Sequence, residues 1–183
     1  MWFRLQAQGI QSSFITMGMH YPVYKEIKEA VQLITRTASN SLITIGDSSV
    51  TDFGKLTRRV YASGSIDESQ LIFSSPNNGI DIPLLSILQT PSVNHYLSRA
   101  MMIHKEEDIL VGIPTKTPTL TIFEEGACSE LKHTNPNISK SYLLSSIFDL
   151  FFTMGLHSED KAGIQPLKSE INLNSIERVQ QDK

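Results

Sequence analysis

The sequence predicts an α+β fold, with a mostly antiparallel sheet of about six strands, two packed helices and a polar C-terminal tail. Three observations support this prediction. Short β-branched runs separated by turn residues fill the first half of the chain, and after Thr90 the apolar residues change to a helical spacing. A second segment with helical spacing follows at 140–155.

The segment 30–47 contains two apolar runs on either side of a Ser39-Asn40 junction. In the first run Val31 and Leu33 recur at period two, which favours a β-hairpin with its turn at this junction. The alternative is a helix over 24–34 followed by a strand, because three apolar residues share one helical face: Ile27, Val31 and Ile34.

Further strands are predicted where β-branched and aromatic residues cluster, at 3–7, 55–63, 69–75 and 79–88. The segment 55–63 also has a helical aspect, since Leu56 and Val60 lie four residues apart. A turn at 76–79 separates the last two strands, and Pro83 places the final one at an edge or a bulge.

After Thr90 the pattern predicts an amphipathic helix over 93–104. Thr90 can act as its N-cap, and Pro91 suits the first turn. The helical spacing is carried by Val93, Tyr96, Leu97, Ala100, Met101 and His104. A pair of strands at 108–114 and 119–125, joined by a polar turn, is predicted to follow.

The segment 140–155 is predicted to be the closing helix, ending at Gly155. Its apolar face contains Leu143, Ile147, Leu150 and Phe151. The domain is therefore expected to span 1–155, and the polar segment 156–183 is expected to be a flexible or docking tail.

Composition excludes several functional classes. The net charge is −3 and no Lys/Arg run stands out, so no nucleic-acid partner is expected. No apolar stretch reaches the roughly 18 residues that a membrane span needs, so no membrane partner is expected. Cys128 is the only cysteine, which points to a reducing compartment, the cytoplasm or also the nucleus.

The segment 43–50, with Gly46-Asp47-Ser48 at its centre, carries the sharpest local motif. A strand ending in Gly-Asp-Ser resembles the first block of the GDSL esterases, in which Ser48 would be the nucleophile. A serine needs a histidine to take its proton and an acid to orient that histidine. The family's late Asp-x-x-His and Gly-x-Asn-Asp blocks are missing, although spacing alone does not exclude a pairing with His133 or His157. An ordinary strand-ending turn is favoured.

No cofactor or metal site is predicted. The histidines are scattered without His-x-x-x-His or His-Glu-x-x-His spacing, so a metal motif is missing. The turn at Asn77–Gly79 has residues that can cradle phosphate, but a lone glycine is weak support for a nucleotide site.

Three stretches resemble the small proteasome assembly chaperones of the chaperone 3 and chaperone 4 type. The stretch 31–47 is similar to that family's early strand hairpin, 82–102 to its strand-then-helix segment, and 108–125 to its closing strand pair. The insertion at 64–79 and the tail beyond Gly155 depart from the family pattern.

The resemblance implies a non-catalytic chaperone that forms a heterodimer with a related small chain and holds proteasome α-type subunits while the α-ring assembles. Such a binding module has no cofactor and needs an exposed face for its partner. The predicted helix over 93–104 is the proposed face, with Tyr96, Met101 and Met102 as contact residues. A serine hydrolase using Ser48 is the alternative function.

Overall fold

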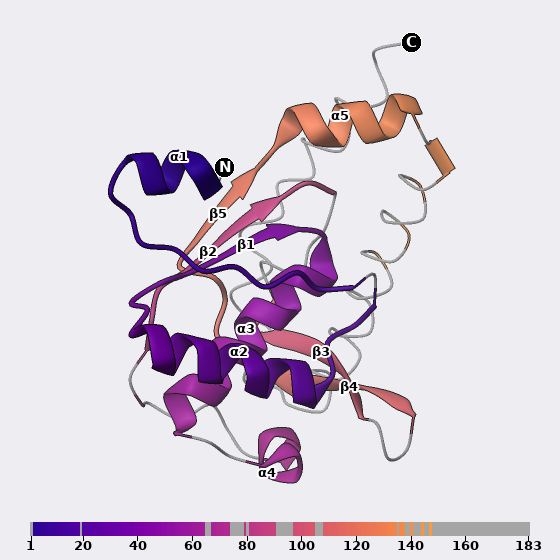
Figure 1. Cartoon of the computed structure of the whole chain (residues 1–183). Coiled ribbons are helices and arrows are strands. Elements are labelled where there is room, and N and C mark those ends of the chain that lie inside the picture. The colour runs from indigo at the N-terminus through magenta and orange to yellow at the C-terminus, as the bar shows by residue number, and fades with distance from the viewer. Residues whose placement is uncertain are drawn as a thin grey trace. The chain divides into compact units, whose positions relative to one another are not determined.

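The computed structural model describes residues 2–18, 20–64, 67–73, 79, 81–90, 97–104, 108–134, 136–137, 140, 144 and 147. The chain separates into two units, Met1–Ser146 and Ile147–Lys183. The elements named below, which Figure 1 labels, all belong to the first unit. In chain order they are α1 Trp2–Ala7, α2 Tyr24–Thr37, β1 Leu42–Gly46, α3 Ser48–Ser63, α4 Glu68–Phe73, β2 Leu84–Leu88, β3 Arg99–His104, β4 Ile109–Pro114, β5 Leu120–Phe123 and α5 Glu125–Thr134.

The strands form two separate sheets. A three-stranded parallel sheet has the order β1-β2-β5, and a two-stranded antiparallel sheet pairs β3 with β4. Helix α3 contacts β1 and β2 as well as β3, so it lies between the parallel sheet and the hairpin (Figure 1). The prediction of a six-stranded antiparallel sheet is therefore wrong, because the central sheet is parallel and small.

Helix α2 shows why the predicted hairpin over 30–47 does not form. Its buried residues Ile27, Ala30 and Ile34 recur at helical spacing. The Glu26 carboxylate accepts a hydrogen bond from the backbone N–H of Val23, which caps the first turn, and Ala38 ends the helix in the left-handed conformation at φ 50°. The alternative, a helix followed by a strand, is confirmed by α2 and β1.

Helix α3 replaces the strand predicted over 55–63. Both Leu56 and Val60 are buried in it, as their four-residue spacing allows. Near its middle, a Cβ added to Gly54 would collide with the methyl of Thr44 and lie 3.1 Å from Leu84 Cδ1. Glycine at this position lets the helix pack closely onto β1 and β2.

The main core lies where α2, α3 and α4 pack against the β3–β4 hairpin. Its buried members come from all of these elements: Ile27, Leu56, Val60, Leu71, Ala100, Met102 and Ile113. On the parallel sheet, the face toward α3 is buried too, with Leu84, Ser86 and Leu88 alternating with half-buried neighbours along β2. Burial of apolar surface on both sides of α3 joins the two sheets.

The opposite face of the parallel sheet is apolar and exposed. Ile43 pairs in register with Leu85, which pairs with Leu120 on its other side, and Ile45 pairs with Ile87, which pairs with Ile122. The outer four of these side chains are 39–57% exposed. The chain adds β1, β2 and β5 to the sheet in one direction, and right-handed connections between such strands all lie on the same face of the sheet. Helix α3 and the hairpin therefore cover that face and leave the opposite face exposed.

Several other predicted elements differ from the structure. Residues of the helix predicted over 93–104 form β3 from Arg99 onward, while 91–96 lie outside the described residues. The strand predicted at 3–7 lies within helix α1, and the described part of the strand predicted at 69–75, residues 69–73, lies within α4. Strands form within the predicted ranges 108–114 and 119–125, as β4 and the shorter β5. However, β4 pairs with β3 and β5 with β2, so they do not pair with each other.

The C-terminal predictions remain largely open. Within the helix predicted over 140–155, the described residues Lys140, Leu144 and Ile147 are helical, and the tail 156–183 lies outside the described residues. The domain boundary at 155 stays a prediction. In the part of the chain that the structure describes, no helix combines the length and apolar character of a membrane span.

Candidate functional site

The carboxyl edge of the parallel sheet is where chemistry-bearing residues converge. Strand β1 ends at Gly46, which has a φ of +152°, a value that other residues rarely adopt. A Cβ added there would lie 2.9 Å from Val50 Cγ2. Glycine therefore permits the sharp passage from β1 into α3, and it brings the backbone close to the first turn of the helix.

The first turn of α3 is capped by Asp47. One carboxylate oxygen, Oδ1, accepts hydrogen bonds from Ser49 N at 3.1 Å, Val50 N at 3.2 Å and Ser49 Oγ at 2.7 Å. These amides are among the first four of the helix, which have no partner within the helix and attract anions. Asp47, Ser48, Ser49 and Val50 are all half-buried, so the turn is accessible from solvent.

Thr90 lies at the same edge, two residues beyond β2. Strand β2 ends at Leu88, which pairs with Gly46, and the next amide, Gln89 N, donates to Gly46 O at 2.9 Å. The α3-facing residues of β2 alternate at 84, 86 and 88, so position 90 continues the same side of the sheet. Thr90 is 8% exposed, and its buried hydroxyl has no hydrogen-bond partner among the described residues.

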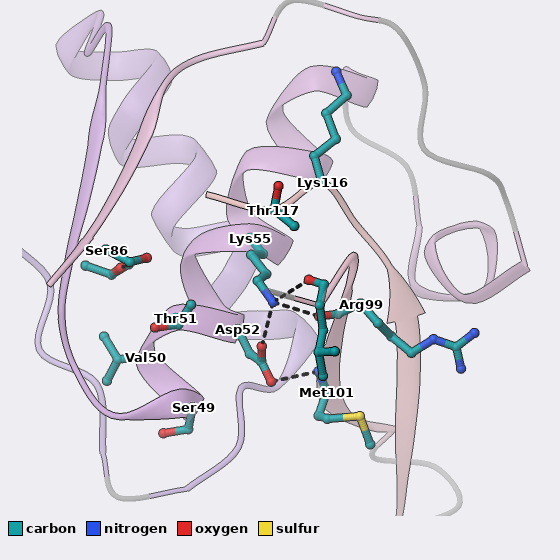
Figure 2. A network of polar contacts seen from close by, with 12 residues as sticks. Ser49, Val50, Thr51, Asp52, Lys55, Ser86, Arg99, Met101, Lys116 and Thr117 are labelled. Carbon is teal, nitrogen blue, oxygen red and sulfur yellow. Dashed lines mark hydrogen bonds and ion pairs between the residues drawn. The ribbon is translucent and has the colours of Figure 1, made fainter. Parts of the chain in front are cut away.

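A buried ion pair anchors α3 to the hairpin, as Figure 2 shows. Lys55 Nζ lies 3.5 Å from Asp52 Oδ1 and donates to Leu97 O at 3.0 Å and Arg99 O at 2.8 Å. Asp52 Oδ2 accepts from Met101 N at 3.0 Å. Burial lowers the pKa of Lys55 below its ordinary value, partly offset by the attraction of Asp52. The network positions the segment that enters β3.

Two arginines extend this anchoring toward the loop after β4. Arg58 Nη2 donates to the carbonyl oxygens of Lys116 and Thr117 at 2.6 and 2.7 Å, and Arg59 Nη1 donates to Pro114 O. Burial lowers the pKa of both guanidinium groups. Since these cations bind backbone carbonyls, they serve the fold rather than an anionic ligand.

Among the described residues, those predicted to be functional are not brought together. Ser48 is the first residue of α3, and no hydrogen bond joins it to a histidine in the part of the chain that the structure describes. Met102 is fully buried in the core, so it cannot contact a partner, while Met101 is half-buried in β3. Tyr96 lies outside the described residues, as do Asn77, Asn78 and His157.

Thr90, Asp52 and Lys55 are the residues that sequence reasoning missed. Thr90 was expected to cap a helix over 93–104, whose described residues form β3 from Arg99 onward. An aspartate and a lysine three residues apart usually indicate an exposed ion pair on the surface of one helix, whereas the side chains of Asp52 and Lys55 are both 0% exposed. Their burial depends on the approach of β3, which the sequence pattern does not show.

A separate surface pocket of about 420 Å³ lies beside α2, away from the carboxyl edge, and is lined by Tyr24, Lys25, Lys28, Glu29, Gln32 and Glu68. Lys25 pairs with Glu29 along the helix at 3.9 Å, and Lys28 lies 5.8 Å from the centre of the Tyr24 ring. These are interactions of a solvated helix surface, so the pocket is the weaker candidate.

The described residues do not form a metal centre. No group of three or more histidine, cysteine, aspartate or glutamate side chains among them is placed to hold a metal ion.

Solved structures match the fold, although neither the models of known families nor the curated proteins contain a match to this chain. An iron-containing alcohol dehydrogenase from Thermotoga maritima aligns with a TM-score of 0.59 at 14% identity, over 67% of this chain and 34% of its own. The NADH-dependent butanol dehydrogenase A of the same organism gives 0.57 at 17% identity, over 69% of this chain and 32% of its own. Sulfoacetaldehyde reductase from Bifidobacterium kashiwanohense, in complex with NAD⁺, gives 0.57 at 11% identity, over 69% and 36%.

At these identities the likeness establishes the fold, and the chain spans 32–36% of the length of these structures. It corrects the resemblance to proteasome assembly chaperones, because the matching structures are dehydrogenases and reductases. The expectations that depended on that resemblance are corrected with it: a non-catalytic role, a sister chaperone chain and proteasome α-type subunits as partners. The serine hydrolase alternative is not supported either, since none of these three matching structures is described as a hydrolase.

Proposed function

We propose that this chain is a nicotinamide dinucleotide-binding unit of an oxidoreductase, and that the carboxyl edge of its parallel sheet holds the phosphates. Open α/β sheets bind ligands outside the carboxyl ends of their strands, where helix N-termini receive anions. Two of the matching structures are described as NADH-dependent or as an NAD⁺ complex, which supports this ligand class.

The observation that carries the proposal is the Thr90 hydroxyl. A buried polar group without a hydrogen bond costs stability, so such a group suits a site where a ligand supplies the missing partner. Thr90 lies at the same edge as Gly46, where the backbone passes close to the first turn of α3. Together these features provide amide and hydroxyl donors, which are the groups that bind phosphate oxygens.

Each residue at this edge has a distinct role in the proposal. Gly46 allows a phosphate to approach the backbone, the hydroxyls of Ser48 and Ser49 and the first-turn amides donate to it, and Thr90 donates from the end of β2. A bound nicotinamide supplies hydride transfer, and the residues of this chain hold and orient the cofactor. Iron is not part of the proposal, because the described residues do not form a site for it.

A titration with NADH and NADPH tests the proposal, with adenosine as a control ligand that lacks phosphates. We expect saturable binding of a dinucleotide and none of adenosine at equal concentration. Thr90→Val, which keeps the shape of the side chain, should weaken dinucleotide binding about tenfold, since it removes one donor. The variant should be as stable as the wild type or more so, because an unsatisfied buried hydroxyl is replaced by a methyl group.

Thr44→Val is the matched control. Thr44 Oγ1 is hydrogen-bonded to Ser86 Oγ at 2.8 Å in the middle of the sheet, on the same face. This variant should lose about 1 kcal/mol of stability and keep the wild-type affinity. A folded wild-type protein that binds neither dinucleotide at millimolar concentration would contradict the proposed function.

A further inference from the structure

We propose that Asp47 is a built-in competitor of the phosphate, which sets the affinity and the charge preference of the site. This inference rests on the proposed function. It follows from the fact that the Asp47 carboxylate already occupies the donors of the first turn of α3 that a phosphate would use.

The contacts of Asp47 resemble those of a bound anion. Its Oδ1 takes two backbone amides, Ser49 N and Val50 N, and the Ser49 hydroxyl. A phosphate oxygen in this place would accept the same three hydrogen bonds. Dinucleotide and carboxylate therefore compete for one set of donors, and the carboxylate is covalently tethered beside them.

Charge adds to this competition. A phosphate near the first turn of α3 would meet the negative charge of Asp47 at short range, and like charges repel more strongly where water is partly excluded. The basic residues nearby do not offset it. Lys55 and Arg58 on the same helix are already hydrogen-bonded to backbone carbonyl oxygens.

The second feature of this edge remains available to a ligand. The buried Thr90 hydroxyl has no partner among the described residues, and it follows the strand that pairs with β1 at Gly46. The edge thus combines two kinds of donor. The first-turn donors of α3 are hydrogen-bonded to Asp47, whereas the Thr90 hydroxyl has no partner among the described residues. Because Asp47 is half-buried, its side chain can leave the amides when a phosphate takes its place.

Two substitutions separate the effect of the Asp47 charge from the effect of its hydrogen bonds to the first-turn amides. Asp47→Asn keeps an oxygen that can cap the helix but removes the charge, and asparagine is as good an N-cap as aspartate. Asp47→Gly also frees the amides, and glycine costs only a few tenths of a kcal/mol at this position. Asp67→Asn is the matched control, since Asp67 accepts from Gln70 N and Ser69 Oγ in the same manner at the start of α4.

The experiment measures binding of NADH and of inorganic pyrophosphate to the four proteins, with urea denaturation confirming that each is folded. We expect Asp47→Asn to bind both probes about fivefold more tightly than the wild type, and Asp47→Gly about tenfold or more, with Asp67→Asn unchanged. The gap between wild type and Asp47→Asn should shrink when the salt concentration rises from about 0.05 M to about 0.5 M, because salt screens the repulsion.

The outcomes distinguish the two proposals. If the wild type and both Asp47 variants bind NADH equally well, the role of Asp47 is wrong and the dinucleotide site stands. If the Asp67→Asn variant shows the same gain, the effect is one of net charge, and the local competition is wrong. If all of the folded proteins fail to bind NADH, the proposed function itself is wrong, and this inference falls with it.

Discussion

The ammonium group of Lys55 donates a hydrogen bond to the carbonyl oxygen of Arg99 at 2.8 Å, which ties α3 to the first residue of β3. Asp52 completes the link, because it contacts Lys55 and accepts from the amide of Met101. Both side chains are fully buried. The pair thus holds the hairpin against the helix whose first turn forms the candidate site.

Removing one partner of this pair should be costly. Lys55→Met removes the ammonium group that faces the buried Asp52 carboxylate and binds two buried carbonyl oxygens. We therefore expect a loss of about 3–5 kcal/mol in the free energy of unfolding. Asp52→Asn should lower the free energy of unfolding much less in the Lys55→Met variant than in the wild type, since the two residues act together. Urea denaturation of the single and double variants measures this coupling, and strictly additive losses would contradict it.

Acid titration provides a second test, at the start of α4. Hydrogen bonds from Gln70 N and Ser69 Oγ hold the pKa of Asp67 below its ordinary value of 3.8. The ionised form is therefore favoured by folding, and its contribution to stability is complete above pH 3.8 and disappears as the pH falls through the folded pKa. NMR titration of the Asp67 carboxyl should give a folded pKa below 3.8, and an unshifted value would remove this contribution.

The two faces of the parallel sheet should respond differently to truncation. Leu88 is buried on the face toward α3, so Leu88→Ala should cost about 2–5 kcal/mol. Ile45 lies on the opposite face and is 39% exposed, so Ile45→Ala should cost less than about 1 kcal/mol. Similar losses measured by thermal unfolding would mean that another surface covers the exposed face in solution.

Local signals in the sequence predicted some elements correctly. The helical spacing of Ile27 and Ile34 and the β-branched residues of 109–114 and 120–123 mark elements that the structure contains. Strand pairing was not predictable from them, because β1, β2 and β5 are neighbours in space and distant in sequence. Strand β3 was mistaken for a helix since its three- and four-residue spacing suits one, yet pairing with β4 decides its conformation.

The candidate site was predictable only in part. The strand does end at Gly46, as expected, but the turn expected at Gly46-Asp47-Ser48 is the start of α3, with Asp47 as its N-cap. The buried contacts of Lys55 and Arg58 with the hairpin and the loop after β4 were not predictable, because charged residues are expected at the surface. Thr90 gained its importance only when β2 was placed beside β1.

NMR amide shifts on addition of NADH show residue by residue whether the carboxyl edge of the sheet binds the dinucleotide phosphates. We expect the largest changes at Ser48, Ser49, Val50 and Thr90, with a smaller response in Thr90→Val. Changes centred on the pocket lined by Tyr24 and Glu68, or no changes at millimolar NADH, would contradict it.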